Sequence, residues 1–465
     1  MPMDSLEASA VDVLVIGGGN AGLCAAITAR RAGARVLLLE SATKHLRGGN
    51  SRHTRDIRYM HRGATEYVTG SYPEAEFWED LRQVTGGDTN ERLALQVIRS
   101  SEDLASWMQT QGVRWQKPLR GTLHLARTNL FMLGGGKAMV NAYYETALAL
   151  GVKVAYQCEV RELDIRDGRF VAARGGAAEE FRARALVVAA GGFEANISWL
   201  KEYWGEAAEN FVIRGTPYNQ GRMLKELLRC GAKPTGNPRG CHAVALDARA
   251  PKFDGGIVTR LDSVPFGIVV NNKVERFYDE GEDFWPKRYA IWGGLIARQP
   301  DQIAYSILDA KALPCFMPSV FPPVEAGSIP ELAAALALDP EKLTAVVERY
   351  NRAVRPGTFN PAVLDDCRTE GLEPPKSHWA RPIDTPPFYG YPLRPGITFT
   401  YLGVAVDERA RVIFQDERPA QNVFAAGEVM AGNILTQGYL AGFGLTIGAV
   451  FGRIAGQEAA RCAAS

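Results

Sequence analysis

A short apolar run that leads directly into a glycine-rich turn constrains this chain more than any other feature. Residues 11–16 read VDVLVI, and the turn GGGNAG (residues 17–22) follows at once. A stretch with helical spacing then runs to Gly33, and residues 35–40 read RVLLLE, a second strand that ends in an acid. Strand, glycine turn, helix, strand and terminal acid together form the dinucleotide-binding unit of Rossmann-like folds. The sequence therefore predicts an α/β protein whose first domain binds a dinucleotide.

Each part of this unit has a role that follows from its geometry. Gly17 allows the tight turn, Gly19 lets a pyrophosphate approach the backbone, and Gly22 lets the helix pack closely on the strand. The start of the helix offers free N–H groups and a positive dipole end to the phosphates. Glu40 is expected to accept hydrogen bonds from a ribose diol, and its charge would repel a 2′-phosphate, which disfavours NADP. The unit alone does not distinguish FAD from NAD.

The C-terminal part of the chain favours a flavin. Residues 422–430 read NVFAAGEVM, which predicts a buried strand followed by Gly427 and Glu428. A glycine-rich stretch, residues 438–448, then leads into a helix. A second glycine-rich helix start, so far along the chain from the first, indicates another contact to the same long cofactor. Its N–H groups would face the flavin carbonyls, where negative charge gathers on reduction.

Length and composition exclude several classes of protein. A chain of 465 residues is too long for one hydrophobic core, so we expect two domains. The formal net charge of +1 gives no sign of a nucleic-acid partner. The seven cysteines form no CxxC pair, so neither a disulfide framework, an iron–sulfur cluster nor another metal site is expected. With no signal-like start and no long apolar run, we expect a cytoplasmic protein without a membrane span.

Five stretches resemble the flavoprotein subunits of the fumarate reductase and succinate dehydrogenase family. They are VIGGGNAGLCAAI (15–27), GGNS (48–51), LVVAAGGF (186–193), VNNKVERFYDE (270–280) and NVFAAGEV (422–429). The resemblance covers essentially the whole chain. It implies an α/β fold with a Rossmann-like FAD-binding domain of the GR2 type and an inserted α+β capping domain. His53-Thr54 is similar to the covalent flavin attachment of succinate dehydrogenase, but its register differs, so non-covalent FAD is expected.

The predicted boundaries divide the FAD-binding domain into residues 1–240 and 386–465, with the capping domain at 241–385. Within the capping domain, composition shifts toward Pro, Trp and Tyr. Ser328 to Glu331 form a capping box and Asp339-Pro340 a second helix start. Glycines 134–136 and Lys137 precede another helical run, either as a plain helix start or as a loop near the dinucleotide.

The residues predicted to contact FAD lie in several stretches along the chain. They are Gly17, Gly19, Asn20, Ala21, Gly22, Glu40, Gly48, Gly49, Asn50, Ser51, Val160, Ala190, Gly191, Gly427, Glu428, Gly444, Leu445 and Thr446.

A narrower resemblance concerns the substrate. Residues 48–58, 279–290, 394–407 and 432–448 are similar to the tricarballylate dehydrogenase family and to the flavin domain of a cobalamin-pathway oxygenase, the oxygen-dependent precorrin-3B synthase. The first implies desaturation of a small organic acid, tricarballylate to cis-aconitate, with electrons passed to a separate acceptor protein at the membrane. The oxygenase carries an extra metal-binding half that is missing here.

The resemblance also implies candidates for proton transfer. In the fumarate reductase family, an arginine of the capping domain that follows an RF-x-N-E-type stretch moves the proton. Here that stretch is 276–280, and Arg288 is the candidate, with Lys287 as the fallback. Because a guanidinium holds its proton tightly, Glu280 is expected to relay the charge. A role for Arg288 in a surface salt bridge stays open.

Candidate substrate-binding residues follow the glycines at the flavin edge. Arg52, His53 and Arg55 form a cationic group, and arginine forks bind carboxylates through two hydrogen bonds. We expect Arg58 to be solvated, and His124 and Arg127 are further members of the group. His242, at the start of the capping domain, is either a substrate ligand or a structural histidine.

Two tyrosines keep a different chemistry open. Tyr439 stands where fumarate reductases carry a clamping arginine, and no histidine accompanies Tyr401, which argues against fumarate or succinate as substrate. In ketone desaturases of the ketosteroid dehydrogenase kind, tyrosines polarise a carbonyl instead. Tyr439 and Tyr401 fit that alternative, whereas the Arg/His group does not.

Overall fold

The computed structural model describes residues 11–118, 125–175, 179–254, 258–317 and 319–465. A six-stranded sheet, in the order β22-β23-β10-β1-β2-β6, forms the centre of the first domain. Its strands are β1 (Val11–Ile16), β2 (Val36–Glu40), β6 (Lys153–Tyr156), β10 (Ala183–Val188), β22 (Arg411–Ile413) and β23 (Pro419–Ala425). All neighbours pair in parallel except β22 and β23. The apolar runs at residues 13–16 and 36–39 are buried, as strands covered on both faces require.

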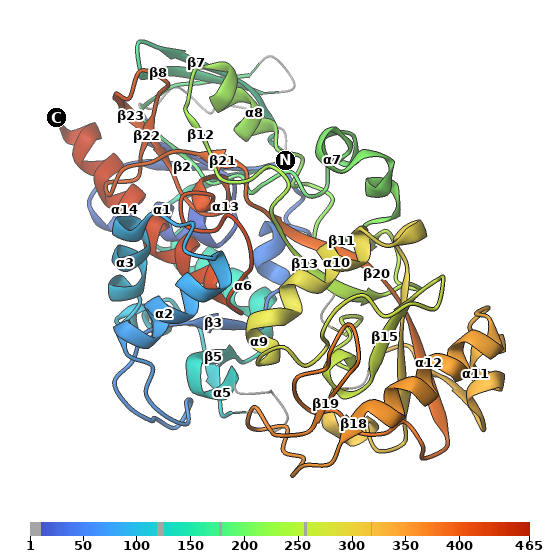
Figure 1. Cartoon of the computed structure of the whole chain (residues 1–465). Helices are drawn as coiled ribbons and strands as arrows, with labels where there is room; N and C mark the ends of the chain where they lie inside the picture. Colours follow the sequence, from blue (N-terminus) through green and yellow to red (C-terminus); the bar gives the residue numbers. More distant parts are fainter. Residues whose placement is uncertain (1–10, 119–124, 176–178, 255–257, 318) are drawn as a thin grey trace.

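Two helices from opposite ends of the chain lie against each other beside this sheet. Figure 1 shows α1 (Asn20–Arg31) next to α14 (Phe443–Ala464). Glycines make the close approach possible, because a Cβ at Gly452 would lie 2.4 Å from the carbonyl oxygen of Ala21. This packing brings the starts of both glycine-led helices to one region, as the sequence predicts for a shared cofactor.

A second sheet of seven strands carries the other side of the site. The long strand β20 (Phe388–Thr400) pairs with β11 (Val212–Arg214), β13 (Cys241–Asp247), β16 (Ala304–Asp309) and β17 (Val324–Ala326). β14 (Phe253–Asp254) and β15 (Ile268–Asn271) complete it. Since β11 and β20 lie outside residues 241–385, this sheet includes strands from both sides of the predicted boundaries, which stay a prediction.

Two predicted helix starts of the capping domain are confirmed. α11 (Ile329–Ala335) begins after Ser328, whose side chain accepts a hydrogen bond from the Glu331 N–H. α12 (Pro340–Ala353) begins after Asp339, whose carboxylate accepts from two backbone N–H groups. Figure 1 shows both helices at the far end of the molecule from the C-terminus.

The other helices and strands surround these sheets. The helices are α2 (Glu74–Thr85), α3 (Glu91–Ser100), α4 (Leu104–Thr110), α5 (Leu125–Thr128), α6 (Gly135–Ala149), α7 (Ile197–Trp204), α8 (Arg222–Arg229), α9 (Trp285–Arg288), α10 (Trp292–Ala297) and α13 (Glu428–Ala431). The strands are β3 (Asp56–Arg58), β4 (Trp115–Gln116), β5 (Asn129–Met132), β7 (Val160–Arg166), β8 (Arg169–Gly175), β9 (Glu180–Phe181), β12 (Pro234–Thr235), β18 (Val354–Arg355), β19 (Arg368–Thr369) and β21 (Gly403–Val404). Among the helices that the structure describes, none has the length and apolarity of a membrane span.

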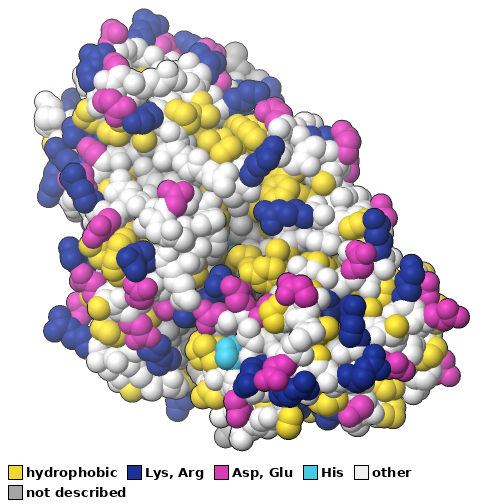
Figure 2. All heavy atoms as spheres, viewed as in Figure 1, with side chains coloured by type: hydrophobic (Ala, Val, Ile, Leu, Met, Phe, Trp, Pro, Cys, Tyr) yellow, Lys and Arg dark blue, Asp and Glu magenta, His cyan; other side chains and the backbone are white. Residues whose placement is uncertain are grey.

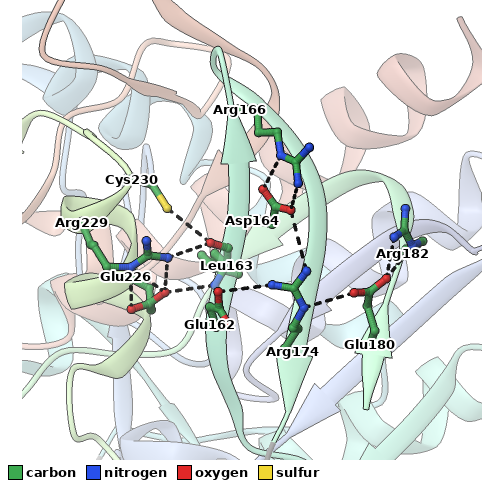
Figure 3. A network of polar contacts seen from close by, with 10 residues as sticks. All are labelled: Glu162, Leu163, Asp164, Arg166, Arg174, Glu180, Arg182, Glu226, Arg229 and Cys230. Atoms are coloured by element: carbon green, nitrogen blue, oxygen red, sulfur yellow. Dashed lines mark hydrogen bonds and ion pairs between the residues drawn. The ribbon is translucent and has the colours of Figure 1, made fainter. Parts of the chain in front are cut away.

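Charged side chains of both signs alternate over the surface rather than forming one-sign patches on the face drawn in Figure 2. Figure 3 shows one such network across β7, β8, β9 and α8, in which Arg174 bridges Glu162 and Glu180. Glu226 of α8 joins it by accepting a hydrogen bond from the Leu163 N–H at 3.0 Å. Exposed pairs of this kind contribute little to stability, on the order of 0–1 kcal/mol each. None of these residues lines the cavity described below, so we assign this network no role in the chemistry.

Candidate active site

A deep cavity lies between the two sheets, with about 1820 Å³ of space not filled by protein atoms, its open mouth included. All residues predicted to contact FAD line it, except Gly22 and Thr446. Gly22 instead supports the turn, because a Cβ there would lie 1.8 Å from the carbonyl oxygen of Gly17. The Thr446 hydroxyl donates to the carbonyl of Arg58. The predicted stretches, distant in sequence, therefore meet at one cavity.

The residues at one end of the cavity fit an adenine dinucleotide. The α1 N-terminus opens into it, with Gly19 at the N-cap and no acid in the first helical turn, and the Ser51 hydroxyl accepts from the Asn20 N–H at 3.0 Å. Glu40 is buried at the end of β2, where its two carboxylate oxygens accept from the N–H groups of Ala42 at 2.9 Å and Gly48 at 3.3 Å. The hydroxyls of Ser41 and Tyr144 make longer contacts to the same two oxygens, each at 3.5 Å, which a ribose hydroxyl could replace. A helix start for phosphate and a fixed acid for ribose are what FAD needs.

The start of α14 supplies a second set of backbone donors. Gly442 precedes the helix with a φ of 78° and no capping side chain, and Gly444 and Leu445 line the cavity. Sequence reasoning missed one further lining segment, residues 218–223. There Gly221, with a φ of 72°, precedes the amphipathic helix α8, and this glycine before a helix is the signal that could have identified it.

The other end of the cavity is cationic. Arg55, Arg214 and Arg260 all line it. The positive charge of Arg260, followed by burial, lowers the pKa of Arg55. Burial, followed by the charge of Arg260, lowers the pKa of Arg214 to about 10. Two carboxylates lie among them, Asp56 at 3.5 Å from Arg55 and Asp262 at 2.7 Å from Arg260. Three guanidinium groups and two carboxylates leave this end of the cavity positive, so an anion placed there would be stabilised.

Arg260 has a distinct set of partners. Its Nη2 lies 2.7 Å from Asp262 Oδ2, and Trp285 donates its indole N–H to Asp262 Oδ1 at 2.7 Å. Although burial acts to raise the pKa of Asp262, Arg260 and Arg55 hold it below its usual value. The guanidinium of Arg260 lies 5.0 Å from the ring centre of Tyr289, and its buried Nε has no hydrogen-bond partner. Arg260 therefore lines the cavity with one buried donor unsatisfied.

His242 is a second side chain with unused hydrogen-bonding atoms. It is buried, stacked on Tyr439 with ring centres 4.1 Å apart, and both its ring nitrogens lack a partner. Burial, with the charges of Arg214 and Arg260, lowers its pKa well below the usual value. His242 is therefore a neutral imidazole in the cavity, able to donate one hydrogen bond and accept another.

The two tyrosines singled out from the sequence occupy different places. Tyr439 lines the cavity, and its hydroxyl oxygen accepts a hydrogen bond from the Gly444 N–H at 2.8 Å. Tyr401 is fully buried, does not line the cavity, and donates to the carbonyl of Gly438. Burial raises the pKa of both hydroxyls. Tyr439 thus belongs to the site, whereas Tyr401 supports the loop that carries it.

The structure does not bring the sequence-based catalytic pair to the cavity. Arg288 forms an ion pair with Glu282, with an N–O distance of 3.1 Å, and neither Arg288 nor Glu280 lines the site. Glu280 is buried against Arg276, which it binds through both oxygens, and it also accepts from the Val269 N–H. Glu280 of the RF-x-x-E stretch therefore ties Arg276 to β15 and is not placed beside Arg288 at the cavity. Lys287 pairs with Asp80 and also lies off the cavity.

The predicted cationic group is also divided. Arg55 alone of the residues 52, 53 and 55 lines the cavity. Arg52 donates to the carbonyl of His45, and burial lowers the pKa of His53 to about 4.

More distant members of that group have structural roles. The expectation that Arg58 is solvated is wrong: it is 2% exposed and donates to the Ala441 carbonyl and the Tyr72 hydroxyl. Arg127 pairs with Glu76, and His124 lies outside the described residues.

At the cationic end of the cavity, sequence reasoning missed Arg214, Arg260, Asp262 and Tyr289. The signal for Arg260 and Asp262 was a charged pair two residues apart in an extended stretch, which places both side chains on one face. Arg214 ends strand β11, and Tyr289 follows α9, which carries Trp285.

Comparison with known proteins agrees with this geometry. The family described as "FAD binding domain" matches residues 12–445. The NADH:fumarate oxidoreductase of Klebsiella pneumoniae (strain 342) is 26% identical over 97% of this chain, which spans only 48% of that protein's length. The 4-oxocyclohexanecarboxylate 2-dehydrogenase of Sinomonas cyclohexanicum is 25% identical, with 98% of this chain and 96% of that protein covered.

Two solved structures share the fold. The open conformation of a flavocytochrome c3 fumarate reductase has a TM-score of 0.74 and 22% identity, over 98% of this chain and 79% of that one. The 3-ketosteroid-delta4-(5alpha)-dehydrogenase of Rhodococcus jostii RHA1 has a TM-score of 0.73 and 22% identity, over 97% of this chain and 96% of that one. With the family match across most of the chain and a cavity that fits the cofactor, this chain belongs to the FAD binding domain family, as an FAD-dependent flavoprotein oxidoreductase.

Proposed function

We propose that this chain is a dehydrogenase of a small polycarboxylate, of the kind that converts tricarballylate to cis-aconitate. The observation that carries the proposal is the group of three arginines, Arg55, Arg214 and Arg260, at one end of the FAD cavity. Their mutual repulsion is relieved by an anion among them. Guanidinium forks bind carboxylates through paired hydrogen bonds, which would fix the substrate in one orientation.

Arg260 and Asp262 are the residues to which we assign proton transfer. When bound, FAD supplies the group that accepts the hydride. The carbon next to the one that loses hydride must lose a proton to a group within reach. Arg260 faces the cavity with an unpartnered Nε–H, and Asp262 lies behind it at 2.7 Å. Because a guanidinium does not readily stay deprotonated, Arg260 would pass a proton to Asp262 as it receives one from the substrate.

His242 and Tyr439 are placed to hold the rest of the substrate. The neutral imidazole of His242 has a donor and an acceptor without partners, and it lies against Tyr439. A hydrogen bond to a substrate carboxylate or carbonyl would satisfy that buried donor, which otherwise costs free energy. This pair would orient the substrate, while the arginines supply most of the attraction.

We also propose that the electrons leave to a separate acceptor protein at the membrane. The support is the resemblance of residues 48–58 and 432–448 to the tricarballylate dehydrogenase family. Reoxidation of the substrate-reduced holoprotein by isolated membranes, but not by the soluble fraction, is the expected result. Equal reoxidation by both fractions would contradict it.

A ketone desaturase is the second candidate, and one observation favours it. The Tyr439 hydroxyl and the Gly444 N–H meet at 2.8 Å at the start of α14, where the helix dipole favours negative charge. With its oxygen accepting from the Gly444 N–H, the Tyr439 O–H would donate to the enolate oxygen that forms when a proton is removed beside a ketone. The relative named 4-oxocyclohexanecarboxylate 2-dehydrogenase supports a substrate with both a ketone and a carboxylate.

Anaerobic visible spectroscopy of the yellow holoprotein separates the two candidates. With tricarballylate added, we expect the oxidised flavin bands to disappear. Bleaching by a cyclic ketone carboxylate, with none by tricarballylate, would support the second candidate instead. Bleaching by neither would contradict both.

The Arg55→Ala variant tests the arginine group directly. We expect substrate affinity for tricarballylate to fall at least tenfold, since one charge-assisted pair contributes about 1.5–3 kcal/mol. The flavin spectrum should stay that of the wild type. Arg352→Ala is the matched control, because Arg352 is exposed on α12. Unchanged affinity in Arg55→Ala would remove this residue from the site.

A further inference from the structure

Two buried carboxyl groups meet at the wall of the FAD cavity. Glu428 follows Gly427 at the end of β23 and lines the cavity, whereas Glu194 follows β10 and is fully buried behind it. Both lie beside the end of β20, where Asn50 donates to Glu194 and to the Thr398 carbonyl, and Thr400 donates to Glu428. The pKa of Glu194 is raised by burial, by the charge of Glu428 and by a side-chain hydrogen bond with it. A hydrogen bond between two carboxyl groups requires a proton on one of them.

The other partners of the pair are all neutral. Glu194 Oε1 accepts from the side-chain amides of Asn50 at 2.7 Å and Asn219 at 2.5 Å. Glu194 Oε2 has no donor partner. Glu428 Oε1 accepts from the backbone N–H of Thr400 at 2.7 Å and from its hydroxyl at 3.1 Å. With amides and a hydroxyl but no cation among these contacts, two negative charges side by side would be strongly unfavourable.

Burial raises the pKa of both groups. That of Glu428 rises to about 7, and that of Glu194, next to the charge of Glu428, rises well above its usual value. Neighbouring groups do not change charge near neutral pH. Burial raises the pKa of Tyr401 well above 10 and that of Cys241 to about 12.

Other titratable groups of the cavity wall also have pKa values far from neutral pH. Burial raises the pKa of Cys158 to about 11 and that of Tyr289 to about 12. It lowers the pKa of His242 well below 6.5. Arg214, which donates to the Thr398 hydroxyl while Asn50 donates to the Thr398 carbonyl, stays charged near neutrality. Of all these titratable groups, the pair of Glu194 and Glu428 is therefore the one whose charge changes near neutral pH.

We propose that Glu194 and Glu428 hold a shared proton and that this proton is a condition for tight FAD binding. FAD carries two negative charges on its pyrophosphate and removes water from the cavity as it binds. Both effects make an ionised pair in the wall less favourable, so binding and proton uptake are coupled. Glu194 acts here as a positioning residue through Glu428. The inference concerns the cofactor alone and does not depend on which substrate is oxidised.

The test is the release of FAD from the holoprotein. Serial dilution between about pH 6 and about pH 9, with free flavin read by fluorescence, gives the Kd at each pH. Coupling to one proton predicts that Kd rises by up to about tenfold per pH unit above the titration of the pair. In Glu194→Gln the amide donates to Glu428 and stabilises its charge, so we expect a Kd nearly independent of pH. Glu428→Gln should behave alike.

The exposed Glu348 of α12 provides the control, since Glu348→Gln removes a carboxylate far from any cavity residue. It should keep the wild-type pH dependence. A wild-type Kd for FAD that does not change with pH would overturn the proposal. A pH dependence of Kd that persists in both Glu194→Gln and Glu428→Gln would overturn it as well. Infrared spectroscopy gives an answer even where a variant binds no FAD. The wild-type holoprotein should show the carbonyl band of a buried protonated carboxyl group near neutral pH, and its absence would contradict the shared proton.

Discussion

Arg260 and Asp262 form an ion pair inside the cavity, with 2.7 Å between Nη2 and Oδ2, while the Nε of the same arginine has no partner. The guanidinium therefore pairs with a fixed carboxylate while lining the cavity. Trp285 fixes the second oxygen of Asp262 with its indole N–H. This arrangement gives Arg260 the neighbour that a proton-transferring arginine needs.

Asp262→Asn should reduce turnover without removing the cofactor. The asparagine keeps the shape of the side chain but accepts no proton, so we expect the rate of flavin reduction by substrate to fall about 10²–10⁴-fold. Stopped-flow absorbance under anaerobic conditions measures that rate, and the visible spectrum reports bound FAD. A rate within a few fold of the wild type would exclude Asp262 from proton transfer.

Arg260→Lys and Arg288→Lys together decide which arginine acts. Arg260 faces the cavity, whereas Arg288 pairs with Glu282 outside it, so we expect loss of turnover only in Arg260→Lys. A lysine cannot reproduce the planar fork that joins two partners. Loss of turnover only in Arg288→Lys would restore the assignment made from the sequence and would require the capping domain to rearrange.

His242→Ala should weaken substrate binding but leave its pH dependence unchanged. The imidazole is already neutral, because burial and the charges of Arg214 and Arg260 lower its pKa well below 6.5. Losing one hydrogen bond at a buried site costs about 1–1.5 kcal/mol, which is roughly a tenfold increase in KM. The measurement is KM between about pH 6 and about pH 8 for both proteins. A wild-type KM that follows a histidine titration in this range would contradict a neutral His242.

The cofactor half of the site was predictable from sequence, and the substrate half was not. Gly19, Glu40 and Gly427 are fixed by local rules, since a turn, a helix start and a strand end each demand particular residues next to one another in the chain. Arg260 reaches the cavity through an isolated bridge to Leu246 of β13, and Tyr289 follows α9, so both depend on contacts between segments distant in sequence. Arg58 was misjudged for the same reason, as its partners Tyr72 and Ala441 depend on tertiary packing.

Gly22→Ala should prevent assembly of the cofactor turn. A Cβ at this position would lie 1.8 Å from the carbonyl oxygen of Gly17, far inside van der Waals contact. Either α1 moves off the sheet or the turn opens, so we expect loss of bound FAD and a clearly lower Tm. Gly33→Ala is a comparison at a glycine where a Cβ meets nothing within 4 Å, although its φ of 92° carries strain of its own. Normal FAD content in Gly22→Ala would show that the turn tolerates a shift of the helix.

Glu428 should make the protein less stable as the pH rises toward and past neutrality. Burial raises its pKa from 4.5 to about 7, so the folded state binds more protons than the unfolded state between these values. Its favourable contribution is complete below about pH 4.5 and is lost as the pH rises through about 7, with a total of about 3 kcal/mol at most. Because glutamine does not titrate, Glu428→Gln should not show this loss of stability with rising pH. Urea unfolding at saturating FAD, compared at about pH 5.5 and about pH 8, should therefore show a smaller pH effect in the variant than in the wild type. Equal pH effects in the two proteins would mean that Glu428 is already ionised in the folded state at the lower pH.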